Sequence, residues 1–425
     1  MFIPFVFILG YTGDYDHISP FYKYLTMASR NRWPMIAHER YFNSLELMNS
    51  VGITEETRHT LCDFFKCDAP KQQDLDAIAQ YKIPEMFEQE LLGEFSSRID
   101  AWMFLMQHNY QPLEDLLDSM LADISQKFEE PIEGIVCYFA PESLRRVAEK
   151  RSIPLFFNEG GPIRPPAYHS LFMYMGRDGL QVSSPNAENR YKQFLHEISK
   201  ISKFPLLSRE EILMLLLDEK FYKDIPLINS PPAYEIGILH QAFLSMFSVQ
   251  HTHMTNHELT FIANKLYSPS QIITRGHPNH GMQTDGTTSF HFLCKCRRIA
   301  GVTANMPIEA LMLGRIACVY SRFQFSFMCN KGMNDPNAQP APLEFVNFLV
   351  FCNYIPLEWM ADENHLRFLA SNPSEVDIFF KAFSYMVRKN PKLKRKYLKS
   401  RNTNLFKKTN ARFACCKKFI FLHNK

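Results

Sequence analysis

The sequence lacks the short motifs of several large enzyme classes. It contains no GxSxG nucleophile elbow, no Walker phosphate loop and no HExxH zinc helix. Apart from a short apolar start, it has no uninterrupted apolar stretch approaching the ~20 residues that a membrane-spanning helix needs. These absences argue against a serine hydrolase, a P-loop NTPase, a zinc peptidase and a membrane-spanning protein.

The ten cysteines follow no disulfide framework. They are scattered, and several lie in apolar runs, which is the pattern of reduced, buried thiols in a cytosolic protein. His251, His253 and His257 with Cys294 and Cys296 match no standard zinc spacing, so we expect no metal site.

The apolar N-terminus, residues 1–10, has no basic segment before it and no small-residue cleavage site after it. We therefore interpret it as a buried first strand rather than as a signal peptide. Together with the cysteine pattern, this predicts a cytoplasmic protein.

Acidic residues are missing from the C-terminal segment. Residues 378–425 hold 15 Lys and Arg and no Asp or Glu, so residues 1–377 hold 47 − 15 = 32 basic and 44 acidic residues, a net charge of −12. An acidic body with a basic tail argues against a nucleic-acid enzyme. The tail fits an anionic membrane surface, and a solvated, disordered tail is the alternative.

Short apolar runs alternate with helical patterns in both halves of the chain. Residues 134–139, 144–151 and 153–157 read as strand, helix and strand, which predicts a βαβ unit in a parallel sheet. Pro141 is expected at the first position of that helix. Helical spacing also covers 84–109 and 113–128.

The second half repeats this organisation. A linker at 226–232 precedes an expected strand at 234–239. We predict an α/β protein with two Rossmann-like domains facing each other across a cleft. The expected domains are 1–225, an acceptor-side domain, and 226–370, a nucleotide-binding domain. Residues 371–390 are expected to form a helix that packs back on the first domain, and 391–425 form the basic tail.

The strongest candidate motif is the segment 302–314, in which a strand runs into a helix closed by Gly314. Pro307 is expected at the first helical position, with Asn305 or Met306 near the cap. The free N–H groups of such a helix start bind phosphate, and Glu309 in the first turn would accept hydrogen bonds from ribose hydroxyls. A plain strand–helix unit, in which Glu309 complements the helix dipole, is an equal alternative.

Two further motifs follow predicted strands. Arg275, Gly276, His277 and Pro278 end one strand, and a histidine held there can donate to a phosphate or a sugar. Glu159 ends another strand before a Gly-Gly pair, and it is our candidate catalytic carboxylate. Arg164, in the loop that follows, can grip a carboxylate or phosphate through two parallel bonds. A turn histidine and a solvated loop glutamate are the structural alternatives.

The loop after the first strand, 10–16, is too loose to be a dinucleotide fingerprint because the GxGxxG spacing is absent. Asp14 and Asp16 are candidates for contacting an acceptor. A solvated turn is an equally good interpretation.

Taken together, these motifs resemble a known family. Residues 276–278, 305–314 and 353–356 resemble bacterial capsule and lipopolysaccharide glycosyltransferases of the two-domain GT-B fold. Adding 159–166 and 372–375 makes the pattern most similar to the retaining β-Kdo transferase modules, which use CMP-Kdo. The resemblance spans about residues 3 to 390.

The resemblance implies that Arg275, His277 and the helix start at Asn305–Glu309 bind the CMP part, and that Glu159 is catalytic. The family also uses an acidic residue after the first strand of the second domain. This chain has Leu239, His240 and Gln241 there. Glu235, which lies earlier, at the start of the strand, is the second candidate catalytic residue. The expected partners are a nucleotide-sugar donor and a glycan or glycolipid acceptor, with no cofactor. A catalytically silent relative that binds glycan is the main alternative, and a sugar-nucleotide epimerase on the same fold is a third.

Overall fold

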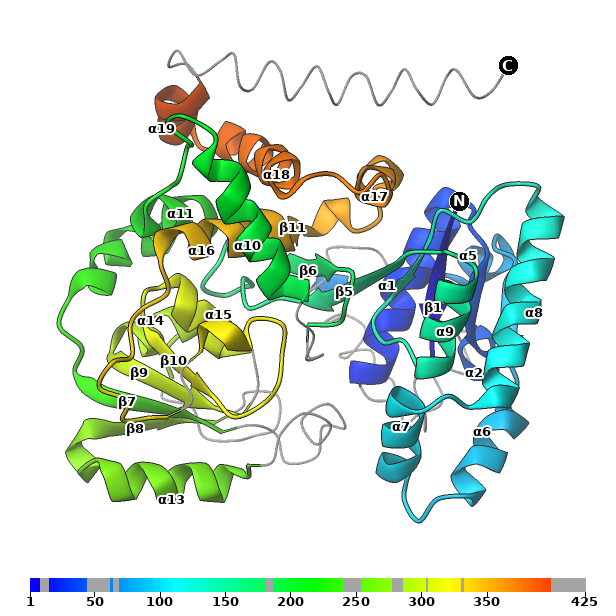
Figure 1. Cartoon of the computed structure of the whole chain (residues 1–425), viewed down its shortest axis with the longest axis horizontal. Coiled ribbons are helices and arrows are strands. Elements are labelled where there is room, and N and C mark those ends of the chain that lie inside the picture. Colours follow the sequence, from blue (N-terminus) through cyan, green and yellow to red (C-terminus); the bar gives the residue numbers. More distant parts are fainter. Residues whose placement is uncertain are drawn as a thin grey trace. The chain divides into compact units, whose positions relative to one another are not determined.

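The computed structural model describes residues 1–7, 15–43, 62–63, 69–180, 186–240, 254–276, 286–302, 305–329 and 332–398, with only the backbone described for 15–20. These residues form two compact units (Figure 1). Unit 1 comprises Met1–Gly160, Met173–Leu180 and Leu357–Asn372. Unit 2 comprises Gly161–Phe172, Gln181–Pro356 and Pro373–Lys425.

Unit 1 is built on a mainly parallel sheet. Its strands are β1 (Phe2–Val6), β2 (Met35–His38), β3 (Gln80–Ile83), β4 (Gly134–Cys137), β5 (Leu155–Gly160) and β6 (Phe172–Gly176). From β6 onward the spatial order is β6-β5-β4-β1-β2-β3, and only the β5–β6 pair among these is antiparallel. This is the strand order of a dinucleotide-binding Rossmann sheet.

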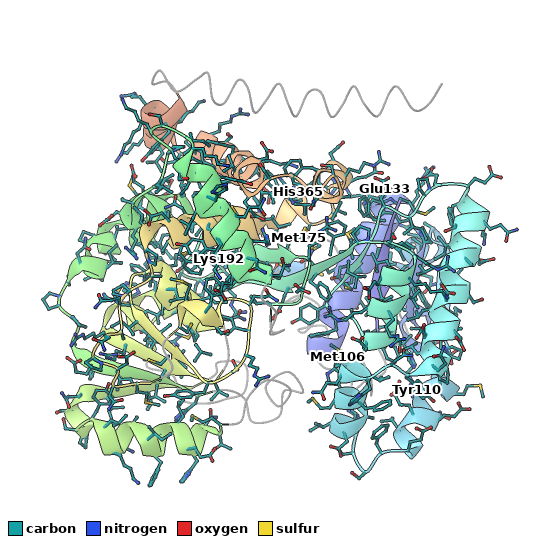
Figure 2. The ribbon with its side chains drawn as sticks, viewed as in Figure 1. Met106, Tyr110, Glu133, Met175, Lys192 and His365 are labelled. Atoms are coloured by element: carbon teal, nitrogen blue, oxygen red, sulfur yellow. The ribbon has the colours of Figure 1, made fainter. Side chains whose placement is uncertain are left out.

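The helices of unit 1 lie between these strands in sequence. They are α1 (Tyr15–Asn31), α2 (Glu39–Phe42), α5 (Gln72–Asp76), α6 (Glu85–Gly93), α7 (Arg98–Gln107), α8 (Gln111–Phe128), α9 (Glu142–Lys150) and, later in the chain, η6 (Leu357–Trp359) and α17 (Glu363–Ala370). Helix α1 packs on β1, and α8 packs on α9 (Figure 1). Tyr110, labelled in Figure 2, is the N-cap residue of α8. Its ring centroid lies 5.2 Å from that of Phe87 on α6.

Unit 2 contains a second sheet with the order β10-β9-β7-β8, parallel throughout. Its strands are β7 (Tyr234–Leu239), β8 (Ile272–Arg275), β9 (Cys296–Gly301) and β10 (Ile316–Val319). Helix α13 (Asn256–Leu266) packs on β7, while α14 (Ser289–Cys294) and α15 (Asn305–Met312) pack on β9 (Figure 1). Ile236, Ile238, Leu259 and Ala300 belong to the core between α13 and the sheet.

The remaining elements of unit 2 flank this sheet in sequence. They are α10 (Asn186–Ser199), α11 (Arg209–Leu216), η1 (Glu219–Asn229), η2 (Pro269–Gln271), η4 (Ser326–Met328), α16 (Leu343–Phe348), η5 (Leu349–Asn353), β11 (Tyr354–Pro356), α18 (Glu375–Lys389), α19 (Pro391–Leu393) and η7 (Lys394–Leu398). In the part of the chain that the structure describes, no helix is both long and apolar enough to cross a bilayer.

Several sequence-based expectations are confirmed and some need correction. The βαβ unit of β4, α9 and β5 is present and parallel, but Pro141 is the N-cap of α9 rather than its first residue. The long helix expected over 84–109 is two helices, since α6 ends at Gly93 and Ser97 caps α7. The 3₁₀ helix η1, which ends at Asn229, covers the first part of the linker expected at 226–232.

The division into units differs from the expected one. Residues 186–225 and α18 belong to unit 2. Aromatic packing explains this grouping, because the ring of Phe379 on α18 lies 5.8 Å from Phe194 on α10 and 4.7 Å from Phe204. The first residues of the basic tail are also ordered there, where Lys396 donates a 2.6 Å hydrogen bond to Glu211. The tail after residue 398 lies outside the described residues.

Gly314 ends helix α15 in a left-handed conformation, with φ = 74°. A Cβ there would lie 2.9 Å from Arg209 Nε. Gly286 has a similar φ of 71°, but no described residue lies within 4 Å of the Cβ that it lacks.

We predict that Gly314→Ala lowers the free energy of unfolding by about 1–2 kcal/mol for the backbone, and by more because of the contact with Arg209. Gly286→Ala is the matched control and should show only the backbone part. Urea unfolding of both variants measures the difference. Equal losses would show that the Arg209 contact contributes nothing.

Candidate active site

Glu159 lies at the carboxyl end of β5 in unit 1. The pairing of β5 with β4 reaches Phe157, so Asn158 and Glu159 extend past the last paired residue of β4. The Glu159 side chain is half-buried. In an open parallel sheet, ligands bind outside the carboxyl ends of the strands, where the strand order reverses. In unit 1 that reversal lies between β1 and β4, and β5 is the next strand.

A lysine that the sequence analysis did not single out lies beside Glu159. Lys23, on α1, is 3% exposed. Its Nζ donates to the backbone oxygen and to Oδ1 of Asn158, both at 3.0 Å. Asn158 is fully buried. The Lys23 ammonium also lies 4.9 Å from the ring centroid of Tyr24 and 5.7 Å from that of Tyr138.

Burial dominates the electrostatics of this cluster. It lowers the pKa of Lys23 to about 7, against an opposing effect of the Glu159 charge. Burial also raises the pKa of Cys137, at the end of β4, to about 12. Near neutral pH the cluster therefore holds a neutral thiol and an amine that exchanges a proton.

The carboxyl edge of the second sheet collects the other candidates. Arg275 is the last residue of β8, and its Nη1 donates to the Thr287 backbone oxygen at 2.9 Å. Its guanidinium carbon lies 5.5 Å from the ring centroid of Phe292. The strand order of this sheet reverses between β7 and β9, and α15 follows β9. Asn305 and Arg275 thus both lie at the edge where a ligand is expected.

Glu309 is the central carboxyl group of this edge. It is 1% exposed, and its Oε1 accepts hydrogen bonds from Tyr168 Oη at 2.6 Å and from Ser289 Oγ at 3.0 Å. Burial raises the pKa of Glu309 to about 7, opposed by these hydrogen bonds and by the charges of Arg164 and Arg275. The two arginines therefore lie close enough to influence this carboxyl group.

The expected start of α15 needs correction. The helix begins at Asn305, so Pro307 is its third residue rather than its first, and Glu309 lies beyond the first turn. Met306 lies in the first turn beside Pro307, and Pro307 is buried. Asn305 Oδ1 is buried and accepts no hydrogen bond within the described ranges.

The loop that carries Arg164 is anchored in unit 2. A Cβ on Gly161 would lie 2.7 Å from the ring of Tyr354 and 2.8 Å from the Phe172 backbone oxygen, which explains the glycine at this position. Arg164 is half-buried. Tyr168, four residues further on, is 1% exposed and makes the hydrogen bond to Glu309.

Glu235 is not brought to this edge. It is the second residue of β7, four residues before the carboxyl end of the strand, which is about 13 Å along its length. Its carboxylate pairs at 3.3 Å with Arg297 near the start of β9, and both side chains are exposed. This position separates it from Arg275, Asn305 and Glu309.

Three candidates cannot be assigned contacts. His277 and Asp14 lie outside the described residues, and Asp16 lies in α1 where only the backbone is described. Among the described residues, no group of three His, Cys, Asp or Glu side chains could hold a metal ion.

The sequence analysis missed Lys23, Tyr168 and Ser289. A signal for Lys23 exists, because it is the only charged residue in the aromatic run 21–25. Ser289 is the first residue of helix α14, whose N-cap is Thr288. The sequence shows a serine at this helix start, but nothing in the sequence indicates a functional role for it. Tyr168 has no local signal, because its role depends on a residue 141 positions away.

We predict that the free energy of unfolding of the wild type rises with pH and that Lys23→Met removes this rise. Lys23 has a pKa of about 7 in the folded chain and its ordinary value of 10.5 in the unfolded chain. Between these values the unfolded chain binds more protons, so the free energy of unfolding rises by about 1.4 kcal/mol per pH unit. Urea unfolding at pH 7 and pH 9 should show this rise in the wild type and in Arg30→Met, an exposed control on α1. If the free energies of unfolding of wild type and Lys23→Met differ by the same amount at pH 7 and pH 9, the prediction is wrong.

We predict the opposite slope for Glu309. Its pKa is about 7 in the folded chain and ordinarily 4.5, so between these values the folded chain binds more protons. The wild type should therefore lose about 1.4 kcal/mol per pH unit from pH 5 to pH 7 relative to Glu309→Gln. Denaturant unfolding at both pH values measures this loss. The control is Glu235→Gln, which removes a carboxyl group that is 37% exposed. Because this variant keeps Glu309, it should show the same loss as the wild type.

Comparison with known proteins adds a family match. Residues 1–184 match the family model described as "Glycosyltransferase 99 family N-terminal domain". A search of curated proteins finds no match. Among solved structures, the chain is similar to Thermosulfurimonas dismutans KpsC, beta Kdo 2,7 transferase, at 17% identity and a TM-score of 0.32, covering 59% of this chain and 88% of that one.

It is also similar to Thermosulfurimonas dismutans KpsC, beta Kdo 2,4 transferase, at 14% identity and a TM-score of 0.28, covering 51% of this chain and 78% of that one. TM-scores this low carry no argument about fold or chemistry. The family match covers fewer than half of the 425 residues. The first 184 residues are therefore similar to the N-terminal domain of a glycosyltransferase family.

Proposed function

We propose that this chain is a glycosyltransferase that moves a sugar, Kdo from CMP-Kdo, to a lipopolysaccharide or capsule glycan acceptor with retention of configuration. The family match over residues 1–184 carries the proposal that the reaction is glycosyl transfer. The choice of CMP-Kdo rests on the motif resemblance of 159–166 and 372–375, added to that of 276–278, 305–314 and 353–356. The proposed location is cytoplasmic, with the basic tail at the inner face of an anionic membrane.

Glu159 is the proposed catalytic carboxylate. Its place at the carboxyl end of β5, half-buried and next to the strand-order reversal, supports this role. In the transfer, the bond between the sugar carbon and the phosphate oxygen breaks, and its electron pair leaves with CMP. For the configuration to be retained, the acceptor oxygen bonds to that carbon from the face that CMP leaves, and the acceptor proton passes to the Glu159 carboxylate.

The nucleotide is proposed to bind at the carboxyl edge of the unit 2 sheet. Arg275 supplies a positive charge there, and the N–H groups at the start of α15 supply fixed dipoles. Both stabilise the negative charge that develops on the departing CMP. Arg164 is the proposed contact for a sugar carboxylate, with His277, Asp14 and Asp16 as further proposed ligands of donor and acceptor.

A catalytically silent relative is the second candidate. One observation favours it: between Glu235 and Glu258 the sequence contains no Asp or Glu, so the carboxyl end of β7 is followed by no acidic nucleophile. Such a protein would bind nucleotide or glycan without transferring sugar.

Activity and binding separate the two candidates. We expect the full chain to release CMP from CMP-Kdo only when a glycolipid acceptor is present. We expect Glu159→Gln to lower kcat by about 10²–10⁴-fold, because a general base is lost, while Glu149→Gln on the exposed face of α9 keeps full activity. CMP at a hundred times its dissociation constant should stabilise both variants by about 2.7 kcal/mol. CMP binding without any CMP release would favour the silent relative.

A further inference from the structure

The proposed transfer does not explain why a lysine is buried in unit 1. Lys23 is 3% exposed, on a helix whose neighbouring residues Phe21, Tyr22 and Tyr24 are also buried. A buried ammonium group costs free energy unless it is hydrogen-bonded or paired with an opposite charge. A core position filled by Met or Leu would avoid this cost. The lysine is therefore expected to contribute something other than packing.

The hydrogen bonds of Lys23 act on one peptide group. The Asn158 backbone oxygen, 3.0 Å from Nζ, belongs to the peptide bond that joins Asn158 to Glu159. The second bond, also 3.0 Å, holds the side chain of the same asparagine. β6 pairs with Asn158 and Glu159 on one side of β5. On the other side, beyond the last residue that β4 pairs, the bonds from Lys23 hold the peptide plane immediately before Glu159.

The charged and titratable groups around Lys23 come from four elements. Glu159 lies on β5, Cys137 ends β4, Tyr138 follows it, and Tyr24 is the next residue of α1. Arg145 on α9 also acts on Cys137. Burial raises the pKa of Tyr24 well above its usual value and that of Cys137 to about 12, so both are neutral near pH 7. Among the described residues, Glu159 is the carboxyl group whose charge acts on Lys23.

The electrostatic influence between Lys23 and Glu159 is mutual. The negative charge of Glu159 raises the pKa of Lys23. By thermodynamic reciprocity, the positive charge of Lys23 must favour the ionised form of Glu159 to the same extent. A general base must be ionised to accept a proton, so the charge of Lys23 acts in the direction that the transfer requires.

We propose that Lys23 is a positioning residue for Glu159: its amine fixes the Asn158–Glu159 peptide group, and its positive charge keeps the Glu159 carboxylate ionised and ready to accept the acceptor proton. The kinetic part of this inference rests on the proposed function. The electrostatic coupling of the two side chains does not, and it can be tested in a protein without measurable activity.

The first test is a pH titration by NMR of the full chain labelled with ¹³C-lysine. One lysine Cε signal, absent from Lys23→Arg, should titrate near pH 7. In Glu159→Gln its midpoint should fall by about one pH unit, because the opposite charge is lost. Glu149→Gln, an exposed acid on α9, should leave it unchanged. No lysine titrating below pH 9, or an equal midpoint in Glu159→Gln and wild type, would overturn the proposal.

The second test is the pH profile of kcat/KM with CMP-Kdo and a glycolipid acceptor. In Lys23→Met the midpoint of the acid limb should move up by about one pH unit, because Glu159 loses the adjacent cation. Lys23→Arg keeps the charge and should keep the wild-type midpoint, as should Arg30→Met on the same helix. If Lys23 had a purely structural role, kcat/KM of Lys23→Met would be lower by the same factor at every pH and the midpoint would not move. This result would also overturn the proposal.

The outcome of each test does not depend on the outcome of the other. If Lys23→Met does not fold, the titration of wild type and Glu159→Gln still decides the coupling. If the wild-type chain releases no CMP, the proposed transfer is wrong, and the titration still shows whether the two side chains interact.

Discussion

The parallel pairing of a central strand on both of its sides determines where chemistry can occur in each unit. β1 pairs with β2 and β4, and β7 pairs with β8 and β9. The chain leaves such a strand toward one face of the sheet, and it leaves the neighbouring strand that comes later in the sequence toward the other face. A crevice therefore opens at the carboxyl ends of these two strands. Glu159, Arg275 and Asn305 all lie at or one strand from these ends, although they come from distant parts of the sequence.

Each of these sheet edges buries one titratable side chain at a cost to stability. Lys23 in unit 1 prefers to be neutral in the folded chain, and Glu309 in unit 2 prefers to be protonated. Within the described residues, Lys23 donates its hydrogen bonds to Asn158, and Glu309 accepts hydrogen bonds from Tyr168 and Ser289. Buried groups with perturbed protonation are concentrated at functional sites, because a plain core would be more stable without them.

Local structure was largely predictable from the sequence, because short-range patterns determine it. The strand at Tyr234–Leu239 and the unit of β4, α9 and β5 follow directly from apolar runs bounded by turn residues. Errors of one or two residues arose at helix starts. At α15, for example, Asn305 is already helical, which moves Pro307 to the third position and Glu309 out of the first turn.

The site was less predictable, because its contacts join residues far apart in the chain. Glu159 and Arg275 were recognisable from their places after predicted strands. Tyr168 was not, since only the folded chain brings its hydroxyl within 2.6 Å of Glu309. Glu235 illustrates the reverse error: the sequence already placed it at the start of its strand, but its charge alone kept it among the catalytic candidates.

The geometry around Lys23 suggests why its hydrogen bonds go to Asn158. A direct, short ion pair with a carboxylate lowers the pKa of that carboxyl group by one to three units, which would make it a weak base. A cation bonded to the neutral oxygens of the preceding residue acts on the carboxylate only through space. Because the Lys23 amine itself loses its proton near pH 7, its charge acts on Glu159 less and less as the solution becomes basic.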